Sequence, residues 1–110
     1  MSGSRYEVVE EAAGVGSIFQ GEYPVATADY RVVTRQLMVL TRSAGGAARR
    51  VPGLQCVDAL IRVRAGRSAP INAPLTLCMD DGRVLEFVAK RPVQREGWSE
   101  IKPIGGPRHN

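Results

Sequence analysis

The chain contains 110 residues, of which 44% are hydrophobic and 24% charged, and its formal net charge at pH 7 is +4. This length and composition predict one globular domain that buries roughly two thirds of its unfolded surface, and they exclude a disordered chain. The longest uncharged apolar run, residues 37–40, is far shorter than the roughly 20 residues of a transmembrane helix, which excludes a helical membrane protein.

The N-terminal part of the chain is expected to hold two short strands. Residues 5–10 and 17–19 have strand character, and the glycine-rich residues 12–16 between them predict a turn. The Gly-Val-Gly sequence in that turn can also bring backbone amides close to a phosphate. No buried strand precedes it and no lysine follows, so a turn is its expected role. Pro24 and the region around Asp29 are expected to interrupt the chain before the next strand.

The next segment, residues 30–42, predicts a long strand because it is rich in β-branched side chains. Its apolar positions change face between Val33 and Leu37, and a bulge at that point would join the two halves. Residues 43–53 contain paired glycines and paired arginines, and we expect them to form a flexible loop.

Residues 54–65 alternate between apolar and mostly polar side chains, which is typical of a half-buried strand. The side chains expected to face the core are those of Val57, Ala59, Ile61, Val63 and Ala65. On the opposite face, Asp58 and Arg62 are interpreted as a surface charge pair. Helical spacing is a competing interpretation of this run, but Gly53 and Gly66 bracket it and its β-branched residues favour a strand.

Residues 75–90 predict a β-hairpin, because two alternating runs flank the Asp-Asp-Gly sequence at residues 80–82. A three-residue loop sets Leu77 opposite Leu85, so that apolar side chains share one face, whereas a two-residue loop mixes the faces. The three-residue loop also places Gly82 at the left-handed position that such a turn requires.

The remaining segments predict short extended elements. Residues 67–74 contain two prolines and are expected to be an extended connection, and residues 98–101 predict a short closing strand at a sheet edge. The fold class expected is all-β, a small antiparallel barrel or sandwich of about six short strands. We expect a single β domain over residues 1–104 and a flexible C-terminal tail over residues 105–110.

The chemistry-bearing residues do not form a recognisable active site. Cys56 and Cys78 are too few and too far apart for a disulfide framework or a zinc site, and His109 lies in the tail. Asp80 and Asp81 belong to the predicted turn, where their side chains stabilise the backbone. We therefore expect a protein that is not an enzyme, with no catalytic residues, no metal and no cofactor.

Charge is unevenly distributed along the chain. Residues 1–30 hold Arg5 and five carboxylates, a net charge of −4, whereas residues 31–67 hold eight arginines and one aspartate, a net charge of +7. If the strands bring these arginines together, they form a basic face suited to phosphate, which a guanidinium binds with two hydrogen bonds. The candidate anion-binding residues are Arg31, Arg35, Arg42, Arg49, Arg50, Arg62 and Arg64.

Three observations weigh against nucleic acid as the partner. The acidic N-terminal strand can pair with the basic strands inside one sheet, and the aromatic side chains that stack on single-stranded bases are sparse. Arginine also outnumbers lysine thirteen to two, which is typical of a GC-rich genome. Nucleic acid or another polyanion is therefore the alternative rather than the favoured partner.

The favoured hypothesis is a non-enzymatic module that binds another protein, a second copy of itself or a small ligand through loops and one sheet edge. Its candidate interaction residues are Leu60, Val88 and Trp98, which are apolar and are expected to point outward or to lie near an edge. The N-terminus lacks the basic and apolar regions of a secretion signal, so we expect a cytoplasmic protein with no membrane partner.

Overall fold

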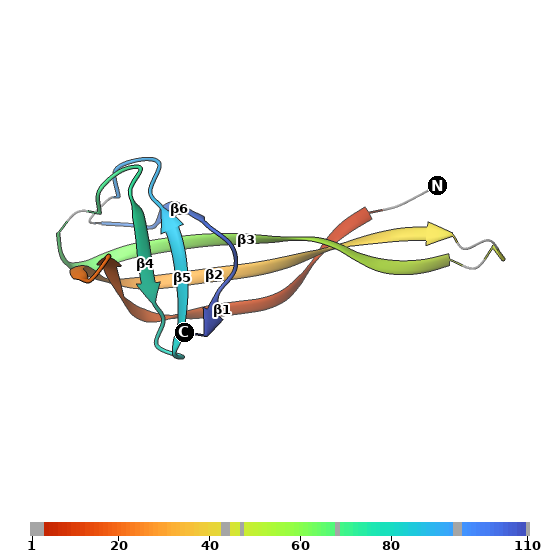
Figure 1. The fold of residues 1–110 in the computed structure, drawn as a ribbon, viewed down its shortest axis with the longest axis horizontal. Coiled ribbons are helices and arrows are strands. Elements are labelled where there is room, and N and C mark those ends of the chain that lie inside the picture. Colours follow the sequence, from red (N-terminus) through yellow and green to blue (C-terminus); the bar gives the residue numbers. More distant parts are fainter. Residues whose placement is uncertain (1–3, 43–44, 47, 68, 94–95, 110) are drawn as a thin grey trace.

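The computed structural model describes residues 4–42, 45–46, 48–67, 69–93 and 96–109 (Figure 1). The described residues form seven β-strands and no helix, as the all-β prediction requires. The described part of the chain therefore contains no apolar helix of membrane-spanning length.

Six of the strands close an antiparallel barrel, which decides between the two architectures that the sequence left open. Around the barrel the order is β1-β2-β3-β6-β5-β4, and β4 pairs with both β5 and β1. β7 pairs with the first two residues of β5, Arg83 and Val84. The strands are β1 Ser4–Gln20, β2 Tyr23–Arg42, β3 Ala48–Gly66, β4 Pro74–Cys78, β5 Arg83–Val88, β6 Ser99–Pro103 and β7 Arg108–His109.

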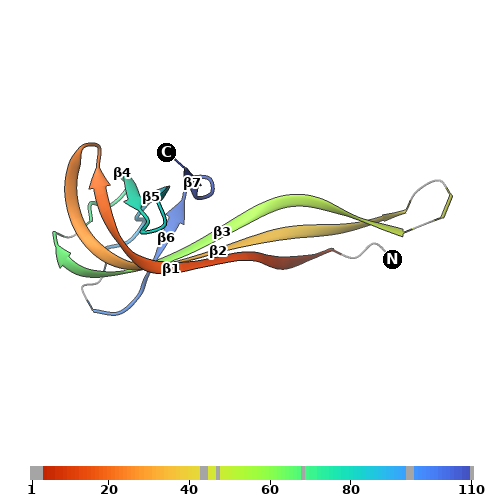
Figure 2. The same ribbon diagram turned by 90° about the horizontal axis from the view of Figure 1, so that it is seen from below.

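The first three strands are much longer than the barrel and continue out of it as a three-stranded arm (Figures 1 and 2). We define the arm as residues 4–8 of β1, 35–42 of β2 and 48–56 of β3, which pair with one another in this order. The molecule measures 58 × 26 × 21 Å, and its radius of gyration is 17.1 Å. A compact chain of this length has a radius of gyration of about 13 Å, so the arm projects well beyond the folded body.

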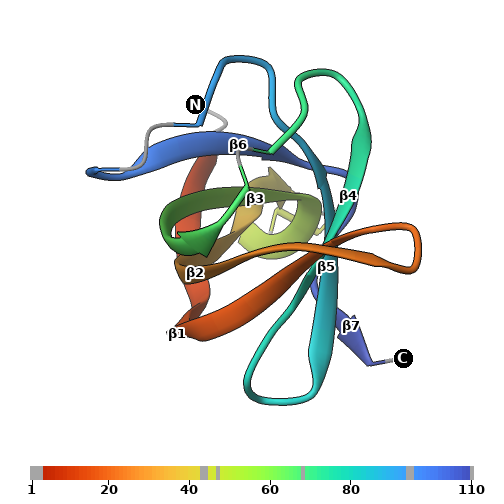
Figure 3. The same ribbon diagram turned by 90° about the vertical axis from the view of Figure 1, so that its left-hand side faces the viewer.

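The core fills the barrel, which Figure 3 shows from the end opposite to the arm. The largest fully buried side chains are those of Tyr30, Phe87, Ile18, Ile61, Leu75, Leu77, Leu85 and Val32. On β3 the predicted alternation is confirmed, since Ala59 and Ile61 are buried and Val57 and Val63 are packed against the core. Ala65 is exposed, because β3 ends one residue later at the rim.

The turn predicted over residues 12–16 is wrong, because these residues lie inside the continuous strand β1. The glycines in this segment allow another part of the chain to approach β1 closely, and they do not form a turn. A Cβ atom at Gly16 would lie 2.5 Å from the carbonyl oxygen of Cys78 and 2.9 Å from Leu77 Cδ1, and one at Gly14 would overlap the Asp80 carboxylate. Glycine is therefore required where β1 meets β4 and the turn after it.

The chain break expected at Pro24 and Asp29 is also wrong, since both residues lie within β2. The turn falls earlier, where Gly21 has a φ of 61°. Pro24 lies one residue inside the strand, next to a register shift, and this is a position where its missing N–H is tolerated.

The apolar positions of β2 do not change face at a bulge in that segment. Tyr30 and Thr34 are buried in the barrel, and beyond Thr34 the strand enters the arm, where residues 36–40 are half-buried on both faces. The extra residues lie in the partner strands instead, at Val9 of β1 and within residues 53–54 of β3. The apparent change of face marks the point where the strand leaves the core.

The hairpin of β4 and β5 has the register predicted from the sequence. Leu77 lies opposite Leu85 and Cys78 lies opposite Val84. The three-residue loop is closed by a hydrogen bond from the Met79 N–H to the Arg83 carbonyl, at 2.8 Å. Gly82 has a φ of 91°, the left-handed conformation that the turn was expected to need.

Two other expectations require correction. Residues 48–53 are part of β3 rather than of a flexible loop, while residues 43, 44 and 47 lie outside the described residues. The closing strand β6 lies between β3 and β5, not at an edge, because it completes the barrel.

In the segment expected to be a flexible tail, Arg108 and His109 pair with β5.

Candidate interaction surface

The arm is a single layer of sheet, so neither of its faces is covered by a second layer. On one face, Tyr6 lies opposite Leu37 and Val39 lies opposite Val51, with Val8 two residues along from Tyr6. We call these five side chains the apolar arm face. Tyr6, Val8 and Val51 are 52%, 53% and 42% exposed, whereas Leu37 and Val39 on the central strand are half-buried. The arm therefore presents apolar surface that this chain does not cover.

Cys56 lies next to Tyr6 on the same face. A hydrogen bond between the Tyr6 hydroxyl and the Cys56 thiol raises the pKa of Tyr6 above its ordinary value. Both side chains remain exposed, and they extend the apolar arm face toward the barrel.

The opposite face of the arm continues the inner wall of the barrel. Met38 and Leu40 are half-buried there, and Pro52 lies opposite Met38. Glu7 accepts a hydrogen bond from Arg50 at 3.2 Å and forms an ion pair that bridges the two outer strands. Charged side chains of the arm itself therefore cover part of this face, whereas they do not cover the apolar arm face.

The two edges of the arm are protected against pairing with further strands. On the β3 edge, Pro52 has no N–H to donate, and an extra residue within 53–54 distorts the strand. At the base of the arm, the bulge at Val9 distorts the β1 edge where it joins the barrel. Proline and bulges are typical devices that block edge-to-edge association, so the faces of the arm are more accessible to a partner than its edges.

A shallow groove of about 450 Å³ lies where the apolar arm face meets the outer wall of the barrel. We call it the base groove. It is lined by side chains of β1, β2, β3 and β6, namely Glu11, Arg31, Val33, Arg35, Asp58, Ala59, Leu60 and Glu100. Arg35 and Asp58 form an ion pair across neighbouring strands. With three carboxylates and two guanidinium groups, the groove has a formal net charge of −1.

The seven candidate anion-binding arginines fall into two groups. Arg31, Arg62 and Arg64 lie on the barrel with Arg35 beside them at the base of the arm, whereas Arg42, Arg49 and Arg50 lie toward the tip of the arm. At a rise of about 3.3 Å per residue, Arg31 and Arg42 are roughly 36 Å apart along β2. The structure therefore does not gather the seven side chains into one compact patch.

Several of these arginines have carboxylate partners. Asp29 accepts from Arg62 at 2.9 Å and from Arg64 at 2.8 Å. Burial of the Asp29 carboxyl favours a higher pKa, but the hydrogen bonds and charges of the two arginines outweigh it and hold that pKa below its ordinary value. The predicted pair of Asp58 with Arg62 is wrong, because residues four apart on a strand are roughly 13 Å apart, and cross-strand partners lie closer.

The three predicted interaction residues lie at separate places on the barrel. Leu60 is half-buried in the base groove, and Val88 is half-buried on β5 between β4 and β6. Trp98 is 43% exposed, and the Arg62 guanidinium lies 5.0 Å from the centre of its ring. Trp98 also lines a second groove, of about 840 Å³, together with the basic side chains of the segment before β6. Of the three, only Leu60 adjoins the arm.

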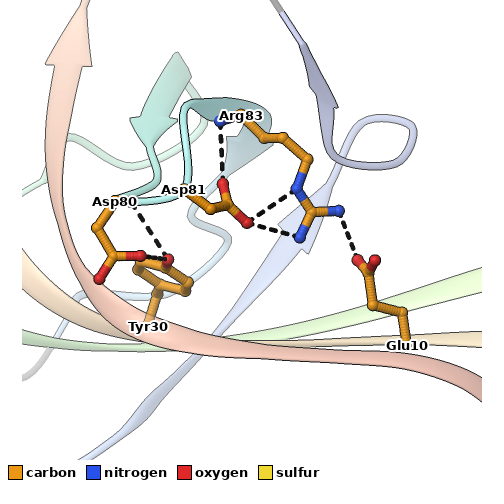
Figure 4. A network of polar contacts seen from close by, with 5 residues as sticks. All are labelled: Glu10, Tyr30, Asp80, Asp81 and Arg83. Carbon is orange, nitrogen blue, oxygen red and sulfur yellow. Dashed lines mark hydrogen bonds and ion pairs between the residues drawn. The ribbon is translucent and has the colours of Figure 1, made fainter.

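A polar network fastens the β4–β5 turn to the barrel wall (Figure 4). The Tyr30 hydroxyl donates to Asp80 Oδ1 at 2.5 Å and accepts from the Asp80 N–H at 3.3 Å. Arg83 donates to Asp81 at 2.8 Å and to Glu10 at 2.5 Å. Each of the five side chains is thus committed to another member of the network.

The pKa shifts in this network agree with a structural role. Burial, followed by the hydrogen bond to Asp80, raises the pKa of Tyr30 to about 12. Hydrogen bonds from Arg83 hold the pKa of Asp81 below its ordinary value, and its two carboxylate partners raise that of Arg83. Tyr30 therefore stays protonated at neutral pH and does not act as a base there.

The cysteines are free thiols, Cys56 exposed and Cys78 half-buried. Among the described residues, histidine, cysteine and carboxylate side chains do not gather in groups of three or more that could hold a metal ion.

Comparison of the chain with protein-family models finds no match, and comparisons with curated proteins and with solved structures find none either. The functional argument therefore depends on the geometry of the arm and the barrel.

The apolar arm face is the feature that sequence reasoning missed. Val51 lies in the segment that the sequence predicts as a loop, and Tyr6 and Val8 lie in one that it predicts as a short strand. One feature of the sequence does point to this face. Residues 37–40 are an uncharged apolar run, and a hairpin of residues 30–42 with the following strand brings Val51 next to them. The sequence does not predict an arm, because the paired glycines near residue 45 are typical of the centre of a flexible loop.

Proposed function

We propose that this protein is a non-enzymatic interaction module that binds another protein through the apolar arm face. The observation that carries the proposal is the uncovered apolar surface of a single-layer arm whose edges are blocked. Covering the half-exposed side chains of Tyr6, Val8 and Val51 is worth roughly 3 kcal/mol in total. A partner that supplies the missing second layer gains this free energy.

Two features of the barrel support a role other than catalysis. The polar network around Tyr30 is satisfied by its own members, and Tyr30 is held in its protonated form. In addition, both grooves lie on the outer surface, and the base groove has an ion pair across its floor. In this proposal the barrel is the rigid body that positions the arm.

Polyanion binding is the second candidate, and one observation favours it. Residues 36–54 contain Arg42, Arg49 and Arg50 and no acidic residue, so this β2–β3 hairpin of the arm has a net charge of +3. Three arginines release about three counterions from a duplex, which gives weak and strongly salt-dependent binding. The apolar face beside them favours a protein partner.

Photo-crosslinking tests the proposal directly. A photoreactive amino acid at position 51, on the apolar arm face, is compared with the same group at position 104, an exposed aliphatic position directly after β6. In the cells that produce the protein, we expect crosslinks to protein from position 51 and few from position 104. Crosslinks to nucleic acid alone, or equal crosslinking from both positions, would contradict the proposal.

A further inference from the structure

We infer that the partner of the apolar arm face is a second copy of this chain, bound so that the two arms run antiparallel with their apolar faces together and each tip lies over the other's base groove. This inference rests on the proposed function and adds the identity of the partner. Two sheets that pack face to face lie about 10 Å apart, so such a pair forms a small sandwich between two barrels.

The available area fixes how far the two arms overlap. The arm strands are five, eight and nine residues long, so they present a face of at most roughly 26 by 14 Å, or about 370 Å² in plan. This is small against the roughly 800 Å² per partner of a standard interface. Extending the overlap to the base groove, from Arg31 to Arg42, lengthens the face to about 36 Å and its plan area to about 500 Å². Projecting side chains make the accessible area of a face larger than its plan area. Of the two overlaps, only the one that extends from tip to base therefore approaches the area that a stable interface buries.

Charge complementarity favours the antiparallel arrangement. Near its tip the apolar arm face carries Arg49, whereas Arg42 and Arg50 lie on the opposite face, and the base groove has a net charge of −1. Arg49 lies opposite Thr41 on the apolar arm face, and Glu100 lies opposite Leu60 on the outer wall. A two-fold axis across the arm places the β3 tip of one copy over the β3 base of the other, which brings Arg49 toward Glu100 and Asp58. Parallel arms would set the basic tips against each other.

A two-fold pair also makes a demand on the shape of the surface. A two-fold interface places the same patch on both copies, so each copy must supply both the projecting part and the hollow that receives it. In the proposed pair the tip is the projecting part and the base groove is the hollow, which side chains of β1, β2, β3 and β6 line. Leu60 on the floor of the groove gives the incoming tip an apolar contact.

Sedimentation equilibrium of the purified full chain tests the inference through charge reversal and rescue. We expect a monomer–dimer equilibrium in which Arg49→Glu raises the dissociation constant roughly tenfold, because each substitution acts at two symmetry-related contacts. Glu100→Arg alone is expected to weaken the dimer similarly. The double variant R49E/E100R is expected to restore it, because the opposite charges face each other again. Both residues are exposed, so the variants are expected to fold.

Val51→Glu and Ile104→Glu form a matched pair for the apolar contact. Both replace an exposed aliphatic side chain with the same charge, and only the first is expected to abolish the dimer. A chain that stays monomeric at all concentrations while position 51 crosslinks to a different protein would overturn the second-copy inference and leave the proposed function standing. Absence of protein crosslinks would overturn both. A dimer that R49E weakens and E100R fails to rescue would overturn the antiparallel arrangement.

Discussion

Replacing Tyr30 with phenylalanine tests how the barrel holds its β4–β5 turn. The Tyr30 side chain is 1% exposed, and its hydroxyl makes two hydrogen bonds to Asp80, one of them to the charged carboxylate. A hydrogen bond to a charged group contributes about 1.5–3 kcal/mol, and its loss leaves the Asp80 N–H without that acceptor. We expect Tyr30→Phe to lower the free energy of unfolding by about 2 kcal/mol, or the melting temperature by roughly 9 °C for a chain of this length.

Urea denaturation followed by circular dichroism measures this loss, with Tyr23→Phe as the control. Tyr23 is 79% exposed, so removal of its hydroxyl is expected to change the stability by less than about 0.5 kcal/mol. A double-mutant cycle with Asp80→Asn isolates the coupling between the two side chains. If Tyr30→Phe unfolds at the same urea concentration as the wild type, the network of Figure 4 does not stabilise the fold.

Three further predictions follow from the packing and the pKa shifts. Gly16→Ala is expected to lower the free energy of unfolding by about 2–4 kcal/mol, because its Cβ meets a backbone carbonyl. Gly45→Ala places its Cβ in open space and is expected to have little effect, and thermal melts compare the two variants. The pKa of Asp29 is lower in the folded state, so its stabilising contribution is complete above its unfolded pKa of about 3.9 and is lost as the pH falls through the folded value. Urea midpoints between about pH 5 and pH 2 are therefore expected to fall less steeply in Asp29→Asn than in the wild type. The pKa of Tyr30 is raised to about 12, so its contribution to the stability of the fold is complete below about pH 10 and is lost as the pH rises to about 12. Absorbance at alkaline pH is expected to show one late-titrating tyrosine, which Tyr30→Phe lacks.

Local patterns in the sequence were sufficient to predict the parts of the fold that depend on near neighbours. The register of Leu77 with Leu85 follows from the side-chain period of a strand and the geometry of a three-residue loop. The core face of β3, with Ile61 at its centre, follows from the same period. Both inferences use only residues within one hairpin or one strand.

The features that were missed depend on residues far apart in the chain. Gly14 and Gly16 resemble turn residues, but they are glycines because the Asp80 side chain and the Cys78 carbonyl approach β1 from more than 60 positions away. The partner of Asp58 is Arg35 of the neighbouring strand, which only the pairing of β2 with β3 determines. The arm was missed because bulges in β1 and β3 break the simple alternation along both outer strands.

Amide hydrogen exchange on dilution tests most directly whether the arm is the surface that a second copy covers. The amides of residues 36–40 lie on the central strand of the arm, so their protection measures how readily the arm opens. Across about a hundredfold dilution through the dimer dissociation constant, we expect protection of these amides to fall at least tenfold while that of residues 28–32 in the barrel stays constant. Equal protection of residues 36–40 at both concentrations would contradict a covered arm.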